Sequence, residues 1–156
     1  MKQFYRITRI LCMFLVMAII PVALVVLEPA PAASATETPL PCDIQIGSCI
    51  LRNSNGMTIE FDIQPKPVAA MSESTFVVRV TWNDKPLTDA SVHLELSMPH
   101  MFMGKNQPIL KHIKEGRYEG KGIITRCASG KKTWQADVAV VSAGKTAVAA
   151  FVFEVK

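Results

Sequence analysis

The chain has 156 residues, of which 49% are hydrophobic, and this suits one small globular domain plus a separate apolar segment rather than several domains. Its formal net charge is +4, but three positive charges and one negative charge lie within residues 1–35, which leaves +2 on the remainder. So small an excess of positive charge does not indicate a nucleic-acid partner.

Residues 1–35 have the features of an export segment. An uncharged apolar run at 10–27 is preceded by basic residues and followed by small ones at 30–35. This order is typical of a secretory signal peptide, and Pro21 favours that interpretation. The apolar run is longer than the about 7 to 15 residues of most signals, however, and matches the about 18 that can span a membrane as a helix.

Two interpretations of the first 35 residues therefore stay open. One is a cleaved signal, and the other is an N-terminal hydrophobic helix retained as an inner-membrane anchor, with membrane contact only through residues 10–27. Basic residues at 2, 6 and 9 stay on the cytoplasmic side in either case. Both interpretations predict that residues 36–156 are periplasmic or otherwise extracytoplasmic.

Residues 36–55 form a Pro/Thr-rich segment, predicted to be an arm along the domain, with Cys42 and Cys49 in it. Together with Cys127 they give three exported cysteines, and an oxidising compartment favours one disulfide with one thiol left over. The short spacing favours a local Cys42–Cys49 bridge. A bridge from either of them to Cys127 is the alternative, and the remaining thiol could be a soft metal ligand or a redox thiol.

From residue 56 to 156 the dominant period is two, with turn residues between the alternating segments, as in β-strands. Seven strands are expected, at 57–64, 76–82, 91–96, 109–113, 118–125, 133–140 and 146–155. Seven short strands without a helix-length amphipathic stretch predict an all-β, immunoglobulin-like or fibronectin-like sandwich. Trp82 and Trp134 are predicted to be packing residues. No catalytic motif stands out, so an enzyme is not expected.

Residues 97–106 depart from strand alternation, because they place Met98, His100, Met101 and Met103 within six positions. Thioether sulfur and imidazole are soft donors that select copper, especially Cu(I), over magnesium, calcium or manganese. A proline and a glycine in the same segment break the strand and let several donors converge. The alternative is that the methionines only fill gaps where the loop crosses the end of the sandwich.

This methionine pattern resembles one found in a known family. M-P-H-M-x-M-G at 98–104, followed by G-x-Y-x-G at 116–120, is similar to YtkA-like and FixH-like domains, over roughly residues 57–155. Further matching residues are Asn106, Gly130 and Trp134. The resemblance implies a small extracytoplasmic β-sandwich, and the FixH branch is associated with copper supply during assembly of respiratory oxidases.

The resemblance makes the motif residues metal-ligand candidates in this chain: Met98, His100, Met101 and Met103. The three exported cysteines lie outside the general family pattern and suggest a disulfide-bearing subgroup. Cys127 becomes an additional ligand candidate if its loop shares the sandwich end with residues 98–104. His112 is another, if its strand passes near that loop, whereas His93 alternates outward and is expected to be solvated.

The leading functional hypothesis is a copper-handling accessory domain that carries Cu(I) and passes it by ligand exchange to a membrane or envelope protein. The alternative is a metal-free structural or interaction module that presents an edge strand or the loop 98–106 to another envelope protein. A thiol redox role is disfavoured, because the chain has neither a C-x-x-C motif nor a thioredoxin-type βαβ pattern.

Overall fold

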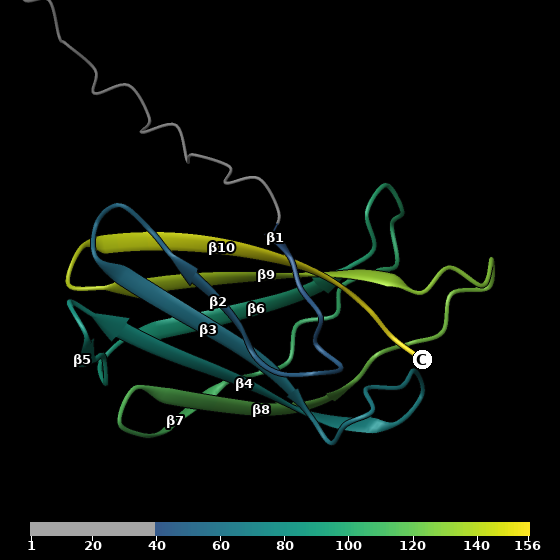
Figure 1. Cartoon of the computed structure of the whole chain (residues 1–156), viewed down its shortest axis with the longest axis horizontal. Helices are drawn as coiled ribbons and strands as arrows, with labels where there is room; N and C mark the ends of the chain where they lie inside the picture. The colour runs from purple at the N-terminus through teal and green to yellow at the C-terminus, as the bar shows by residue number, and fades with distance from the viewer. Residues whose placement is uncertain (1–39) are drawn as a thin grey trace, which may run out of the picture. The chain divides into compact units, whose positions relative to one another are not determined.

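A computed structural model describes residues 40–156, and they form two β-sheets that face each other (Figure 1). The predicted all-β sandwich is confirmed, and no helix occurs among the described residues. The predicted N-terminal helix and the export segment lie outside them. Within residues 40–156 there is no helix of the length and apolarity needed to cross a membrane.

The two sheets contain ten strands. One sheet has the order β1-β10-β9-β6, and the other has the order β2-β3-β4-β8-β7 with β5 beside β4. The strands are β1 (Leu40–Pro41), β2 (Cys49–Arg52), β3 (Met57–Gln64), β4 (Glu73–Trp82), β5 (Lys85–Pro86), β6 (Ser91–Ser97), β7 (Lys111–Lys114), β8 (Arg117–Ile123), β9 (Thr133–Ser142) and β10 (Lys145–Glu154). All seven predicted segments contain a strand, whereas β1, β2 and β5 were not predicted.

The core lies between the sheets and consists of the inward halves of the alternating strands. Strand β3 buries every second residue from Met57 onward, as its sequence pattern predicts. Phe61 stacks on Phe151 of β10 with ring centroids 5.6 Å apart. Trp134 is fully buried, and Trp82 is partly buried with the Lys145 Nζ 3.8 Å from its ring centroid. The five largest fully buried side chains are aromatic, namely Trp134, Phe61, Phe76, Phe151 and Phe153.

Part of the predicted arm takes part in both sheets. Strand β1 pairs with β10 in parallel, and β2 pairs with β3 antiparallel. A disulfide joins Cys42 to Cys49 and closes the loop between β1 and β2. Inside this loop Ile44 is fully buried, and the Gln45 side chain hydrogen-bonds both backbone groups of Val68. The disulfide therefore closes the loop, while apolar packing and polar contacts hold it to the domain.

The G-x-Y-x-G motif at 116–120 lies at the start of strand β8. Its residues allow neighbouring segments of the chain to pack against that strand. Tyr118 is buried, and its hydroxyl donates to the Leu87 carbonyl at 2.9 Å while accepting from the Ala90 N–H at 3.1 Å. A side chain at Gly120 would meet the Ile109 carbonyl oxygen at 2.4 Å. The missing side chain thus lets the segment that follows the methionine loop lie against β8.

Replacing Tyr118 with phenylalanine should lower the free energy of unfolding by about 1–3 kcal/mol, since the Leu87 and Ala90 backbone groups would lose their partner. Urea unfolding of both proteins measures the difference. An unchanged midpoint would mean that water replaces the hydroxyl and that this motif residue has no structural role.

Candidate functional site

Strand register brings the methionine loop beside the loop that precedes β9. Ser97, the last residue of β6, pairs with Gln135 near the start of β9. Because the two strands are antiparallel, the chain leaving β6 and the chain entering β9 meet at one end of their sheet (Figure 1). Residues 98–104 and 126–132 therefore share that end, as the Cys127 hypothesis required.

The methionine loop begins with a tight turn. The Met101 N–H donates to the Met98 carbonyl at 3.1 Å, with Pro99 and His100 between them. His100 has a φ of 62°, so the turn combines proline at its second position with a left-handed third residue, the arrangement of a type II turn. Glycine or asparagine normally occupies that third position, and a histidine there is held at a conformational cost.

Two sulfur atoms meet at this end of the sandwich. The Cys127 Sγ lies 3.4 Å from the Met101 Sδ, and the thiol donates a hydrogen bond to the thioether. Met98 and Cys127 are 3% and 4% exposed, whereas Met101 and Met103 are partly buried and pack against the core. We call these four residues the sulfur corner. His100 is exposed, and no hydrogen bond of its side chain is found within residues 40–156.

The surroundings of Cys127 favour its thiolate. The Ser129 hydroxyl, 3.0 Å from the sulfur, is the main cause that lowers the pKa of the thiol, and the Ser129 N–H and Lys131 act in the same direction. Burial opposes them. Among residues 40–156, the disulfide occupies the other two cysteines and leaves Cys127 as a free thiol. The sulfur corner therefore contains neutral methionine sulfur atoms and one cysteine sulfur that becomes anionic when the thiol ionises.

A cavity of about 240 Å³ borders the thiol, and four of its ten lining residues are basic. Its lining includes Arg126, Cys127, Lys131, Lys132 and Trp134. The indole Nε1 of Trp134 is buried and has no hydrogen-bond partner in the part of the chain that the structure describes. Of these basic side chains, Lys131 contributes positive charge that lowers the pKa of the Cys127 thiol and so favours the thiolate.

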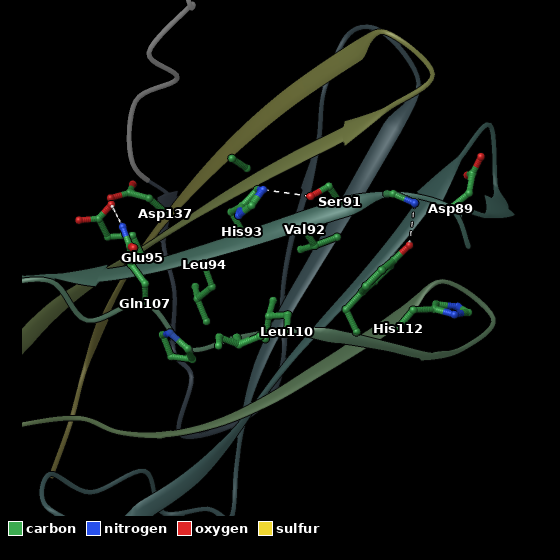
Figure 2. Close-up of a pocket in the computed structure, with 15 residues that line it drawn as sticks. Asp89, Ser91, Val92, His93, Leu94, Glu95, Gln107, Leu110, His112 and Asp137 are labelled. Carbon is green, nitrogen blue, oxygen red and sulfur yellow. Dashed lines mark hydrogen bonds between the residues drawn. The ribbon is translucent and has the colours of Figure 1, made fainter.

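The other two histidines lie away from the sulfur corner. His93 is exposed on strand β6, where its ring is 3.0 Å from the Ser91 hydroxyl. His112 is exposed on β7 of the other sheet and packs on Tyr118, with ring centroids 5.1 Å apart. Figure 2 places it near Asp89, at the beginning of β6, whereas Met98 follows the end of that strand. The structure does not bring His112 to the methionine loop.

Sequence reasoning missed the role of Ser129, the hydroxyl that contacts the Cys127 sulfur. The signal was the C-x-S spacing, which lets a hydroxyl reach back to the sulfur within one turn. In residues 40–156 no three His, Cys, Asp or Glu side chains are grouped so that they could hold a metal ion. Methionine sulfur is the additional donor type that the sulfur corner offers.

A carboxylate pair occupies the outward face of β6 and β9, where Glu95 is directly opposite Asp137. Burial is the main cause that raises the pKa of Asp137, and Glu95 raises it further, while a hydrogen bond from Gln135 lowers it. A carboxyl whose pKa is higher in the folded than in the unfolded protein costs stability once it ionises.

The Asp137→Asn variant should therefore be more stable than the natural protein at neutral pH, because asparagine is uncharged and can still accept from Gln135. The gain should shrink as the pH falls through the raised pKa of Asp137, since the carboxyl is then protonated in the natural protein too. The thermal unfolding midpoints of both proteins, taken from acidic to neutral pH, measure this gain in stability. A gain that is independent of pH would assign the effect to packing instead.

Comparison with known proteins finds a family model that matches part of the domain. No curated protein and no solved structure matches the chain. The family model described as YtkA-like matches residues 52–126, from the end of β2 to the loop that precedes Cys127. The match includes the methionine loop and the G-x-Y-x-G motif but not the disulfide loop or the free thiol. The β-sandwich of this chain is therefore similar to YtkA-like domains over these residues, and the resemblance predicted from the sequence is confirmed.

Proposed function

We propose that this YtkA-like domain is an extracytoplasmic accessory protein that binds copper, as Cu(I), at the sulfur corner and passes it on without catalysing a reaction. The single observation that carries the proposal is the contact between the Cys127 and Met101 sulfur atoms, 3.4 Å apart. Thiolate and thioether sulfur are the ligands that Cu(I) prefers. Copper is the cargo of the domain rather than a resident cofactor.

The burial pattern of the corner suits a carrier. Cys127 is almost enclosed and can hold the ion with a negative charge, whereas Met101 and Met103 are partly open to solvent. His100 stands exposed on the turn beside them, where it can bind an arriving or departing ion. An open, thioether-rich site exchanges ligands more readily than a closed cage of four thiolates. These features support transfer to another protein.

The family match and the sequence support an extracytoplasmic location and a protein recipient for this function. The YtkA-like match suggests an extracytoplasmic accessory domain. The apolar segment at 10–27 and the absence of a strong positive charge fit export and a protein recipient rather than a nucleic acid. The recipient proposed is a membrane or envelope protein that needs copper.

Anaerobic titration of the purified full-length protein with Cu(I), in competition with a coloured Cu(I) chelator, tests the proposal. One Cu(I) per chain should bind, and replacing both Met101 and Met103 with leucine should weaken the affinity. Leucine conserves side-chain volume, so the fold should be retained. If the double variant binds Cu(I) as tightly as the natural protein, the methionine loop takes no part in copper binding.

A second function is favoured by the burial of Met98, which is 3% exposed and belongs to the core. Met101 and Met103 also pack against that core, as gap-filling methionines do. In this alternative the domain is a metal-free interaction module of the envelope. Its recipient would then bind copper-free and copper-loaded protein equally well, whereas a carrier should bind its recipient more tightly when loaded.

A further inference from the structure

Three segments of the chain enclose the cavity beside Cys127: the segment before β4, the loop between β8 and β9, and the residues after β10. Backbone hydrogen bonds hold them together. The Val155 N–H donates to the Lys132 carbonyl at 3.0 Å. The Lys156 N–H donates to the Val68 carbonyl, also at 3.0 Å. The walls of the cavity are therefore held in place by the fold itself.

The lining of this cavity carries positive charge and no acidic side chain, and we call it the basic cavity. Its basic residues are Arg126, Lys131, Lys132 and Lys156. None of the four takes part in an ion pair within residues 40–156, whereas five other basic residues do. A terminal carboxylate at Lys156, whose backbone oxygen accepts from the Ala70 N–H at 3.2 Å, would offset one of these charges and leave three.

The indole of Trp134 lies at the inner side of the basic cavity. Trp134 is 0% exposed although it belongs to the lining, whereas the four basic residues are exposed and lie toward the solvent. Its Nε1 is the only buried side-chain nitrogen or oxygen atom of residues 40–156 that has no hydrogen-bond partner. A buried donor without an acceptor costs stability. A ligand with oxygen acceptors would satisfy this donor.

Size and charge limit the ligands that suit the basic cavity. Its volume of about 240 Å³ corresponds to about eight water molecules of about 30 Å³ each. Sites for drug-sized molecules are larger, at about 300–1,000 Å³. Guanidinium and ammonium groups bind the oxygen atoms of carboxylates and phosphates, and a guanidinium can bind two oxygens at once. These properties favour a small anion with several oxygen atoms.

We infer that the basic cavity binds a small oxyanion with at least two negative charges, of the polycarboxylate or phosphate class. Arg126 and Lys132 would bind its charged oxygens, and the Trp134 N–H would donate to an oxygen at the inner side. The anion would lie beside the sulfur corner, since Cys127 belongs to the same lining. The inference does not rest on the proposed copper function, because neither the basic residues nor the tryptophan are proposed copper ligands.

Isothermal titration calorimetry on the full-length, copper-free protein tests the inference, with citrate and inorganic phosphate as probes at constant ionic strength. At least one of them should bind, and acetate, which has a single charge, should bind at least about tenfold more weakly. The double variant Arg126→Gln/Lys132→Gln should weaken the binding of that probe roughly tenfold. The matched control is Lys111→Gln/Lys114→Gln, which removes as much charge from exposed positions on β7. Its affinity should equal that of the natural protein.

The indole N–H resonances in NMR spectra show whether the anion enters the basic cavity or only meets its exposed charges. The chain has two tryptophans, and Trp82 lines a separate cavity with Lys145. The bound probe should shift the indole resonance of Trp134 and leave that of Trp82 unchanged. A Trp82→Phe variant assigns the two signals. Trp134→Phe, which retains an aromatic ring but lacks the N–H, should bind the probe several-fold more weakly.

Several results would overturn the inference. One is that neither citrate nor phosphate binds, and another is that acetate binds as tightly as they do. An unchanged Trp134 resonance in the presence of bound probe would mean that only the exposed charges hold the anion. An equal loss of affinity in the two double variants would mean that binding follows the net charge of the protein and not this cavity.

Discussion

The Cys127→Ser variant should bind Cu(I) at least about 100-fold more weakly than the natural protein, if the sulfur corner is a copper site. Serine offers a neutral, hard oxygen in place of a thiolate, and Cu(I) prefers soft sulfur. The Ser129 hydroxyl and Lys131, which now favour the thiolate, would have no anion to stabilise. A single methionine replacement should cost less, because it removes one neutral donor.

Competition with a Cu(I) chelator under anaerobic conditions measures this effect, and Met57→Leu is the matched control. Met57 is buried like Met98 but lies beside Trp82 and Lys145, at the opposite end of the sandwich from the methionine loop. The Met57→Leu variant should bind Cu(I) with the affinity of the natural protein. If Cys127→Ser retains full Cu(I) affinity while Met101→Leu loses it, the thiol is not a ligand and the methionine loop acts alone.

The sequence predicted the strands well because one face of each is buried. In strands β3, β6 and β9 every second residue is buried, and the residues between them are partly buried or exposed. The two-residue strand β1 is too short to show a period, and its partner Phe151 lies more than a hundred positions away. Its pairing depends on tertiary contacts, which local pattern does not contain.

The candidate site was only partly predictable, for a related reason. Composition alone singled out the methionines, but it does not reveal that Met98 continues the inward face of β6 while Met101 reaches Cys127. That contact depends on the register of Ser97 with Gln135, which joins two distant loops. For the same reason the sequence left open whether His112 reaches the methionine loop, since its distance from that loop depends on the arrangement of the two sheets.

Replacing Phe61 with alanine should lower the free energy of unfolding by about 3–5 kcal/mol, which approaches the whole stability of many small domains. Phe61 is 0% exposed and contacts both Phe151 and Phe153 of the facing sheet. A smaller side chain leaves a cavity that two β-sheets cannot easily close, since each is held by its own ladder. Denaturant unfolding measures the loss.

Phe102→Ala is the matched control, because it is the same substitution at a residue that is 92% exposed. Its effect on stability should stay within about 0.5 kcal/mol, since little apolar surface is buried there. Phe102 stands between Met101 and Met103, so a defect of this variant in copper transfer, without loss of stability, would mean that the recipient contacts the methionine loop. Equal destabilisation by both substitutions would instead contradict the described packing of the two sheets.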